Sequence, residues 1–358
     1  MQENSMYKSF VRPLLFLLPP EKIHELIVAT VKIAFRIPGF KSFISQIYKS
    51  KELRPVSLMG LDFPSRVGLA AGFDKNASFY KEFSAFGFGF IEIGTVTPRP
   101  QPGNPKPRSF RLPEDKALIN RMGFNNEGVD AAVERLKDRP KDFIIGGNIG
   151  KNTATPNSEA VNDYVYCFER LYNYVDYFVV NVSCPNISDM KELQDQEMLE
   201  GILSRLQAIR AQKSPQKPVL LKISPDLNEQ QIDETLKIMK KTGVDGIVAT
   251  NTTVSRTGLK TSDQKILEIG KGGLSGRPIT QRSTEIIKYI RQKAGKDLPI
   301  IGVGGIMSPE DARKKIEAGA DLVQVYTGFV YEGPGLVRRI GGEAGSSKLE
   351  AGRKRKRE

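Results

Sequence analysis

Cysteine, histidine and tryptophan are scarce in this chain of 358 residues, which has two cysteines, one histidine and no tryptophan. The two cysteines, Cys167 and Cys184, can form neither a disulfide framework nor a zinc site, so a reducing, cytosol-facing compartment is expected. The one histidine, His24, lies close to the N-terminus. Acid–base chemistry in the remainder of the chain must therefore use other side chains.

Long apolar runs are also missing. A transmembrane helix needs about 18 or more consecutive apolar residues, and no run in the sequence reaches that length. The short apolar run 14–18 ends at Pro19 and Pro20, and no small-residue cleavage pattern follows it. We therefore expect neither a membrane-spanning helix nor a secretory signal peptide.

Acidic residues are outnumbered by basic ones, with 54 Lys and Arg against 41 Asp and Glu and a formal net charge of +13. The excess is concentrated at the ends: residues 1–55 hold nine Lys/Arg against four Asp/Glu, and residues 348–358 hold six against two. The body between them carries only +4. This distribution argues against a nucleic-acid partner and favours basic termini, one of which can face an anionic lipid surface.

From residue 66 onward, short apolar runs alternate with polar or Gly-rich turns and with stretches of helical period. Runs that are apolar on both faces are typical of parallel strands covered by helices, which predicts a barrel or a doubly wound sheet. The number of runs, eight, favours an α/β fold of the (β/α)₈ TIM-barrel class. The runs comprise residues 67–71, 90–93, 143–147, 178–182, 219–223, 246–249, 300–303 and 322–325.

Two intervals in this alternation are longer than the others. Residues 96–125 are dense in Pro, Gly and Asn, which predicts an ordered excursion with a hairpin above the mouth of the barrel. Residues 251–280 contain a second glycine-rich stretch, GKGGLSGRP. Both follow predicted strands, on the side where barrel active sites are built.

Residues 1–50 do not follow the alternation and are expected to form an N-terminal helical extension. Pro20 can occupy the first turn of a helix whose apolar and charged side chains recur with helical period. The apolar set is Ile23, Leu26, Ile27, Val31, Ala34 and Phe35, and the opposite face carries Lys22, Glu25, Lys32 and Arg36. Two interpretations remain open: a cap over the bottom of the barrel, or amphipathic helices that contact a membrane.

The barrel domain is expected to span residues 51–340. Residues 341–358 differ in composition, GGEAGSSKLEAGRKRKRE, and show no apolar periodicity. They are predicted to be a disordered, solvated basic tail.

Glycines follow the seventh and eighth predicted strands. Gly304 and Gly305, and further on Tyr326, Thr327 and Gly328, can offer backbone N–H groups to a phosphate, as the loops after strands seven and eight of such barrels commonly do. Glycines also serve tight turns, so the pair alone is a weak signal. Its position favours a phosphate-bearing cofactor.

Asparagines follow several predicted strands or lie in the excursion, and they would meet at one mouth: Asn120, Asn181, Asn186 and Asn251. Carboxamides both donate and accept hydrogen bonds. Such a set suits a planar ligand with alternating C=O and N–H groups, for example a pyrimidine.

Two lysines and a cysteine also lie at predicted strand ends. Because a buried unpaired ammonium is costly, Lys75 and Lys222 are each expected to face an anion or a developing negative charge, and the alternative is a structural ion pair. Cys184, in the polar stretch NVSCPN, is a candidate base or nucleophile. Cys167, in the aromatic stretch DYVYCFERLYNYV, is expected to be a packing residue.

Across residues 20–340 the sequence resembles the dihydroorotate dehydrogenase family. The resemblance rests on the stretches IEIGTVTPRPQPGNPKPR, INRMGFNN, NIGKN, ATNTT, GGLSGRP and IIGVGGI, in this order and spacing. The segments PPEKIHEL and FRLPED are similar to the membrane-associated, quinone-using class. In bacteria that class lies peripherally on the cytoplasmic face of the inner (cell) membrane.

The resemblance implies FMN as the cofactor and oxidation of (S)-dihydroorotate to orotate in de novo pyrimidine (UMP) synthesis. It implies FMN contacts at Ala71, Gly72, Lys75, Thr95, Asn148, Asn181, Lys222, Thr250, Gly276, Gly305, Tyr326 and Thr327. It implies substrate contacts at Lys75, Asn120, Arg121, Met122, Gly123, Phe124, Asn181, Asn186, Asn251 and Thr252. The residues that match the lining of the family's quinone tunnel are His24, Arg111 and Tyr326.

Cys184 departs from the pattern of the quinone-using class, whose members carry Ser there, and is the mark of the soluble class that uses fumarate or NAD. We expect Cys184 to be the catalytic base that takes a proton from C5 of dihydroorotate while C6 passes a hydride to the flavin. A base need not determine where the electrons go next. For the electron acceptor we therefore give the N-terminal extension more weight than Cys184. The extension predicts a membrane quinone, and the alternative is a fumarate- or NAD-linked enzyme.

Two other protein classes fit less well. A tRNA dihydrouridine synthase is also an FMN barrel with a cysteine, but it needs an RNA-binding helical domain where this sequence has a short polar tail. A non-catalytic membrane-bound flavin module would need neither Cys184 nor the asparagines.

Overall fold

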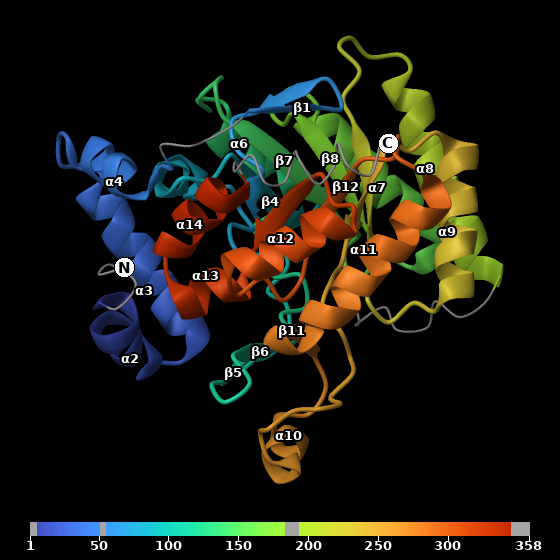
Figure 1. Cartoon of the computed structure of the whole chain (residues 1–358). Helices are drawn as coiled ribbons and strands as arrows, with labels where there is room; N and C mark the ends of the chain where they lie inside the picture. The colour runs from blue at the N-terminus through green and yellow to red at the C-terminus, as the bar shows by residue number, and fades with distance from the viewer. Residues whose placement is uncertain (1–5, 51–54, 183–192, 345–358) are drawn as a thin grey trace, which may run out of the picture.

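Eight parallel strands form a closed barrel at the centre of the computed structural model, which describes residues 6–50, 55–182 and 193–344 (Figure 1). The strands are β3 (Val67–Leu69), β4 (Phe90–Val96), β7 (Ile144–Ile149), β8 (Tyr177–Asn181), β9 (Val219–Ile223), β10 (Gly246–Ala249), β12 (Ile300–Val303) and β13 (Leu322–Val325). Neighbours along the chain also pair in space, and β13 closes the ring onto β3. The predicted (β/α)₈ barrel is confirmed, and its last four strands have the predicted bounds.

Helices cover the outside of the barrel. They are α5 (Tyr80–Phe83), α6 (Val129–Leu136), α7 (Ala160–Leu171), α8 (Leu193–Arg210), α9 (Glu229–Thr242), α11 (Thr280–Ala294), α12 (Pro309–Ala318), α13 (Thr327–Glu332) and α14 (Gly335–Ala344), with short 3₁₀ turns η2 (Ser84–Phe86), η3 (Asn157–Glu159) and η4 (Arg277–Ile279). Their apolar faces and outward strand residues such as Ile145, Phe178 and Leu221 form the main core. Capping sets the helix ends: Asn228 and Gln231 form a capping box before α9, and Gly243 ends that helix with a φ of 73°.

The N-terminal end of the barrel is closed by an antiparallel hairpin of β1 (Val56–Leu58) and β2 (Leu61–Phe63). Phe63 is fully buried and packs edge-on against Phe90, with 5.2 Å between the ring centroids. Phe90 and Tyr177 are the first residues of β4 and β8, so this is the bottom of the barrel. The interpretation of the N-terminal extension as a cap over the bottom is therefore wrong, because the hairpin occupies that place.

The two long intervals meet above the opposite end, the mouth of the barrel. The predicted hairpin is present as β5 (Ser109–Leu112) and β6 (Ala117–Asn120). The second interval adds β11 (Gly273–Gly276) antiparallel to β6, with Gly273 opposite Asn120, and carries the short helix α10 (Asp263–Ile269), which extends away from the barrel in Figure 1. This three-stranded sheet forms one wall of the mouth.

The N-terminal extension lies beside the mouth. It comprises the π-helical turn η1 (Tyr7–Val11), α2 (Arg12–Phe16), α3 (Pro20–Ala34) and α4 (Phe40–Tyr48), drawn in blue at one edge of Figure 1. Helix α3 starts at Pro20 as predicted and contacts β5, while Val31 and Phe35 pack against the barrel helices. The hydroxyl of Tyr7 donates to Val330 O at 2.7 Å. The extension is thus packed on the barrel along its length.

Ten of the thirteen exposed large apolar side chains in the described part of the chain lie between residues 6 and 43. Phe10, Leu14 and Leu17 are the most exposed of these, at 69%, 67% and 78%. They gather on η1, α2 and the turn that follows α2. Among the residues that the structure describes, no helix combines the length and apolar composition needed to cross a bilayer.

The C-terminal helix extends into the predicted tail. Helix α14 continues to Ala344, so residues 341–344 are helical and their assignment to a disordered tail is corrected. The prediction ended the barrel domain four residues too early, because it relied on composition, and composition does not determine where a helix ends. Residues 345–358 lie outside the described residues.

Candidate active site

One cavity of about 1090 Å³ occupies the mouth of the barrel and extends between the N-terminal helices. Strand ends, the three-stranded sheet, α2 and α3 all contribute to its lining. The part within the barrel, here called the chamber, is polar and includes Thr95, Asn181 and Lys222. The part within the extension, here called the channel, is apolar and includes Leu15 and Ile27. A polar chamber and an apolar channel therefore form one space.

The expected cofactor residues lie together around the chamber. Its lining includes Ala71, Gly72, Lys75, Thr95, Asn181, Lys222, Thr250, Gly276, Gly305, Tyr326 and Thr327. Asn148 is the exception. It is fully buried, and its Oδ1 accepts a hydrogen bond of 2.5 Å from the Thr95 hydroxyl. Asn148 thus lies behind Thr95, which lines the cavity.

Most of the expected substrate residues line the same cavity: Lys75, Asn120, Met122, Gly123, Phe124, Asn181, Asn251 and Thr252. Arg121 does not. Its guanidinium lies over the Phe110 ring at 4.6 Å and donates to Ile269 O and to Lys271 O. Because successive residues of an extended chain point to opposite faces, Arg121 faces away from the side of its neighbour Asn120. Cys184 and Asn186 lie outside the described residues.

A chain of buried hydrogen bonds supports the floor of the chamber. The Asn181 amide donates to Thr95 Oγ1 at 2.9 Å, and the Asn148 amide donates to Glu92 Oε1 at 2.7 Å. Gln324 donates to the other oxygen of Glu92 at 2.6 Å. Glu92 and Gln324 are both fully buried within the barrel. Sequence reasoning missed them, although each is a polar residue in a largely apolar strand.

Lys75, which is half-buried, and Lys222, which is buried, have amines without a carboxylate partner among the described residues. Lys222 is 6% exposed, its Nζ has no hydrogen bond or ion pair among the described residues, and burial lowers its pKa, with Glu92 acting in the opposite direction. Lys75 Nζ donates to Asn125 Oδ1, and burial together with nearby Arg108 lowers the pKa of Lys75 to about 7. The alternative that these lysines form structural ion pairs finds no support in the described residues. Both amines are suited to an incoming anion.

Two glycines leave one wall of the chamber without side chains. Gly305 has a φ of 71°, and a Cβ there would lie 2.5 Å from the backbone nitrogen of Thr280. Gly276 has a φ of 100°, and a Cβ there would lie 2.4 Å from Lys116 O. Only glycine fits both positions. Glycine at these positions therefore allows close backbone approach, of Gly305 to Thr280 and of Gly276 to Lys116.

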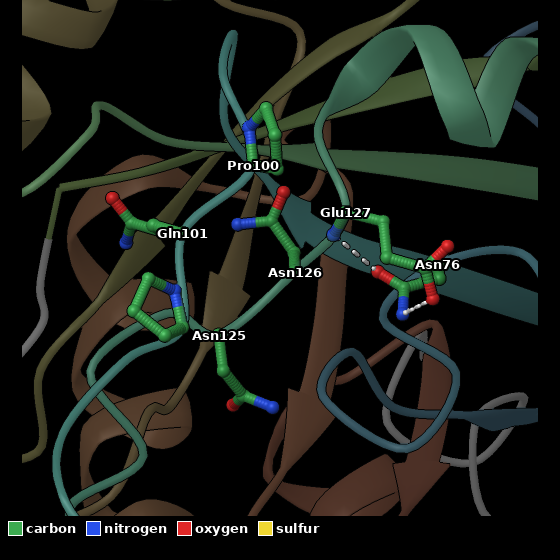
Figure 2. A pocket seen from close by; sticks show the side chains of 7 residues that line it. Asn76, Pro100, Gln101, Asn125, Asn126 and Glu127 are labelled. Atoms are coloured by element: carbon green, nitrogen blue, oxygen red, sulfur yellow. Dashed lines mark hydrogen bonds between the residues drawn. The ribbon is translucent and has the colours of Figure 1, made fainter.

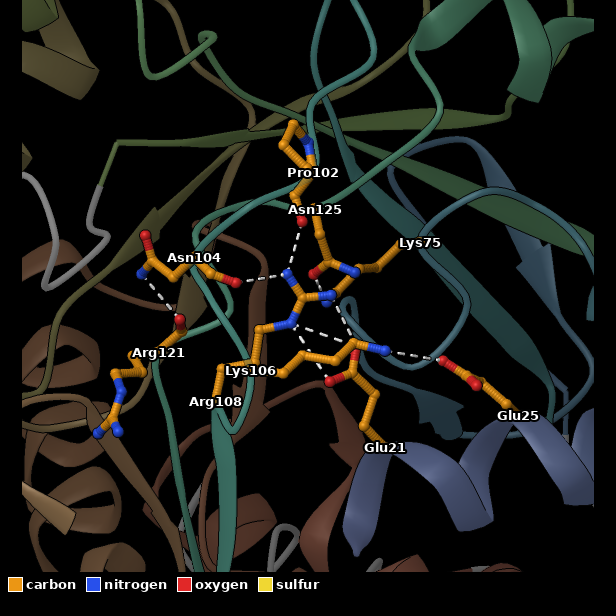
Figure 3. Close-up of polar contacts among 9 residues, drawn as sticks. All are labelled: Glu21, Glu25, Lys75, Pro102, Asn104, Lys106, Arg108, Arg121 and Asn125. Carbon is orange, nitrogen blue, oxygen red and sulfur yellow. Dashed lines mark hydrogen bonds and ion pairs between the residues drawn. The ribbon is translucent and has the colours of Figure 1, made fainter.

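A polar cluster fastens α3 to the excursion, as Figure 3 shows. Arg108, which is buried, pairs with Glu21 of α3 at 2.7 Å and donates to Pro102 O and Asn104 O. Lys106 lies 3.5 Å from both Glu21 and Glu25. Sequence reasoning did not identify this cluster. It holds the channel helix against the loop that carries Asn125, the partner of Lys75.

His24, Arg111 and Tyr326 all line the cavity, where the chamber meets the channel. The His24 ring packs edge-on against Phe73 at 5.0 Å, and burial and then Lys75 lower the pKa of His24 to about 4. Burial raises the pKa of Tyr326 to about 12. Arg111 lies over the Phe16 ring at 4.4 Å and donates to Leu18 O at 2.5 Å. At neutral pH the histidine and the tyrosine are therefore uncharged.

A second, polar depression of about 460 Å³ adjoins the chamber. Its lining is Asn76, Pro100, Gln101, Pro102, Asn125, Asn126 and Glu127 (Figure 2). Asn76, Asn125 and Glu127 also line the main cavity. The depression therefore adjoins the chamber on the side where Lys75 lies.

Comparison with known families decides the identity of this barrel. Residues 54–346 match the family model described as dihydroorotate dehydrogenase. The chain belongs to the dihydroorotate dehydrogenase family. The resemblance stated from the sequence motifs is confirmed, and the matched region contains the whole barrel and the excursion.

Relatives of this chain match it along nearly their whole length. A protein of Christiangramia forsetii named dihydroorotate dehydrogenase (quinone) is 54% identical over 94% of this chain and 97% of its own. One of the same name from Idiomarina loihiensis is 47% identical over 93% and 98%. A crystal structure of DHODH from Eimeria tenella in complex with ferulenol superimposes with a TM-score of 0.78 at 35% identity, over 91% of this chain and 90% of that one.

Proposed function

We propose that this dihydroorotate dehydrogenase oxidises (S)-dihydroorotate to orotate in de novo pyrimidine synthesis, with FMN as cofactor and a membrane quinone as electron acceptor. One observation carries the proposal: a single cavity joins a chamber of buried amines and amides to an apolar channel between α2 and α3. The chamber suits a polar anion, and the channel suits an apolar acceptor. The names of the quinone-dependent relatives support the same assignment.

The residues of the chamber fit FMN. Gly276 and Gly305 line the cavity and would offer backbone N–H groups to the phosphate, and Lys222 presents a buried amine without a partner among the described residues. When bound, FMN supplies the hydride acceptor for the reaction. Thr95 and Asn181, held by the chain that ends at Glu92, would contact it with fixed donors and acceptors.

The side chains of the chamber would have separate roles in binding the substrate and in catalysis. Lys75 would hold the substrate carboxylate, while Asn120, Asn181 and Asn251 would hold the ring edges. Cys184, as the base, would accept the proton from C5, and a thiol with a reference pKa near 8.5 does this closer to neutral pH than an alkanol. Lys222 would stabilise the negative charge that develops beside it.

The quinone would enter through the channel from the membrane surface. His24, Arg111 and Tyr326 lie where the channel meets the chamber and would meet the quinone head. The exposed Phe10, Leu14 and Leu17 would insert into one leaflet. The enzyme would then lie peripherally, on the cytoplasmic face of the inner membrane.

The proposed function is tested by identifying the flavin and comparing electron acceptors. Denatured protein is expected to release FMN, because the glycine wall is suited to one terminal phosphate. Steady-state oxidation of dihydroorotate is measured side by side with ubiquinone, menaquinone, fumarate and NAD. Turnover with a quinone well above turnover with fumarate or NAD is expected; preference for fumarate or NAD, or release of FAD, would reject the proposal.

Membrane contact is tested by replacing Phe10, Leu14 and Leu17 together with serine. Full burial of such side chains is worth about 1.5–3 kcal/mol each, so binding to anionic liposomes is expected to weaken by at least about 100-fold. Turnover with a long-chain quinone in liposomes should fall, whereas turnover with a short, water-soluble quinone should not. The control is Leu267→Ser, since Leu267 is 79% exposed but lies on α10. Equal liposome binding by the triple variant and the parent protein would contradict the membrane assignment.

A further inference from the structure

Lys315 is a fully buried lysine outside the cavity lining. It lies on α12, and its ammonium reaches the first turn of α11. There Nζ donates to Ser283 Oγ, to Thr284 Oγ1 at 3.1 Å and to Thr280 O at 3.4 Å. All three partners are neutral.

No carboxylate neutralises this ammonium in the part of the chain that the structure describes. Asp311, on the same helix, is the acidic group that acts on Lys315, but its Oδ2 accepts from Met307 N at 3.0 Å and from Ser308 Oγ at 2.8 Å. Burial lowers the pKa of Lys315 to about 7. The N-terminal end of α11 adds a partial positive charge of its own. A site with two positive features and no anion is costly unless an anion lies nearby.

Two residues that hold Lys315 also bond to Gly304 and Gly305, which form part of the chamber wall. Ser283 Oγ donates to Gly304 O at 2.9 Å, and Thr280 Oγ1 donates to Gly305 O at 2.7 Å. Gly304 and Gly305 line the cavity. An ammonium can only donate, so it obliges the Ser283 hydroxyl to accept from it and to donate onward to Gly304. The Ser283 hydroxyl is therefore the only group between the Lys315 ammonium and Gly304 O in this chain of hydrogen bonds.

We propose that Lys315 is a positioning residue for the cofactor phosphate: it places a positive charge behind Gly304 and Gly305 and fixes the Ser283 hydroxyl, which donates to Gly304 O. The inference rests on the proposed function, because it takes FMN as the ligand. A purely structural role would be served as well by an apolar side chain of the same length, which would avoid the cost of burying an unpaired charge.

The test separates the phosphate from the rest of the flavin. Purified holoenzyme is equilibrated with a mixture of FMN and riboflavin, and the ratio of the two bound flavins is measured after rapid gel filtration. The Lys315→Met variant is expected to lose at least about tenfold in its preference for FMN, because riboflavin lacks the charge that Lys315 would neutralise. Lys315→Gln, which keeps polar contacts but not the charge, should lose a similar factor. Because the readout is a ratio, it does not depend on the fraction of folded protein.

The matched control is Lys217→Met. Lys217 is partly buried and, like Lys315, donates to a backbone carbonyl, here Val175 O, but it lies before β9 at the bottom of the barrel. This variant should keep the parent's preference for FMN. An unchanged preference in both Lys315 variants would overturn the inference and leave the proposed function intact. Absence of any bound flavin from the parent protein would instead reject the proposed function.

Discussion

Replacing Cys184 with alanine is expected to slow reduction of the bound flavin by dihydroorotate by roughly 10²–10⁴-fold, the usual contribution of a general base. The sequence places Cys184 shortly after β8, which ends at Asn181 in the chamber. The variant should still bind FMN, and its reoxidation by quinone should be nearly unchanged. The measurement is stopped-flow reduction of the flavin across pH.

Two companion variants make this result specific. Cys184→Ser is expected to keep partial activity but to need a higher pH, because an alkanol is far less acidic than a thiol. Cys167→Ala is the control: Cys167 is fully buried in α7, and burial raises its pKa well above the usual value, so it should affect stability and not the pH profile. Flavin reduction in Cys184→Ala as fast as in the parent would remove Cys184 from the mechanism.

Replacing Lys222 with methionine is expected to slow flavin reduction by roughly 10²–10³-fold, the loss typical when one group that stabilises developing charge is removed. Its amine lines the chamber and has no partner among the described residues, so its charge is available to a ligand. The flavin should also become harder to reduce. Flavin content, the rate of reduction by dihydroorotate and the reduction potential are measured together.

The matched control is Lys151→Met. Lys151 is a buried lysine just after the neighbouring strand β7, but its amine donates to Thr155 O at 2.8 Å and to Asn152 O at 3.4 Å, and it does not line the cavity. Its loss should lower the melting temperature and leave both the reduction rate and the potential unchanged. A parent-like potential in Lys222→Met would show that the lysine does not act on the flavin.

The barrel was predictable because each strand is a short apolar run closed by a turn. Four strands match their predicted bounds, and the shorter β3 and the longer β4 differ only at their ends. The pairing of β6 with β11 was not predictable, since it joins segments about 150 residues apart through backbone hydrogen bonds that leave no pattern of side chains. The place of the extension was not predictable either, because an amphipathic period shows that a helix has a partner and not which one.

The candidate site was predictable where a residue lies at the end of a strand or shortly after it, as Lys75, Asn181 and Lys222 do. It was less so where side-chain direction decides, as with Arg121, which turns away from the cavity. Glu92 and Gln324 could not be assigned a partner from the sequence, because their meeting depends on closure of the barrel between β13 and β3. The placement of Cys184 and Asn186 stays a prediction.

The hydrogen-bond chain at the floor of the chamber has a direction. Both oxygens of Glu92 accept, so the Asn148 amide turns its nitrogen toward Glu92 and its oxygen toward Thr95. The Thr95 hydroxyl then has a lone pair left for the Asn181 amide, whose oxygen remains an acceptor. A ligand with donor and acceptor edges exchanged would place donor against donor or acceptor against acceptor at Asn181, whose amide cannot rotate without losing its hydrogen bond to Thr95. We therefore expect Glu92, which does not line the cavity, to fix which hydrogen-bonding groups Asn181 presents to a ligand.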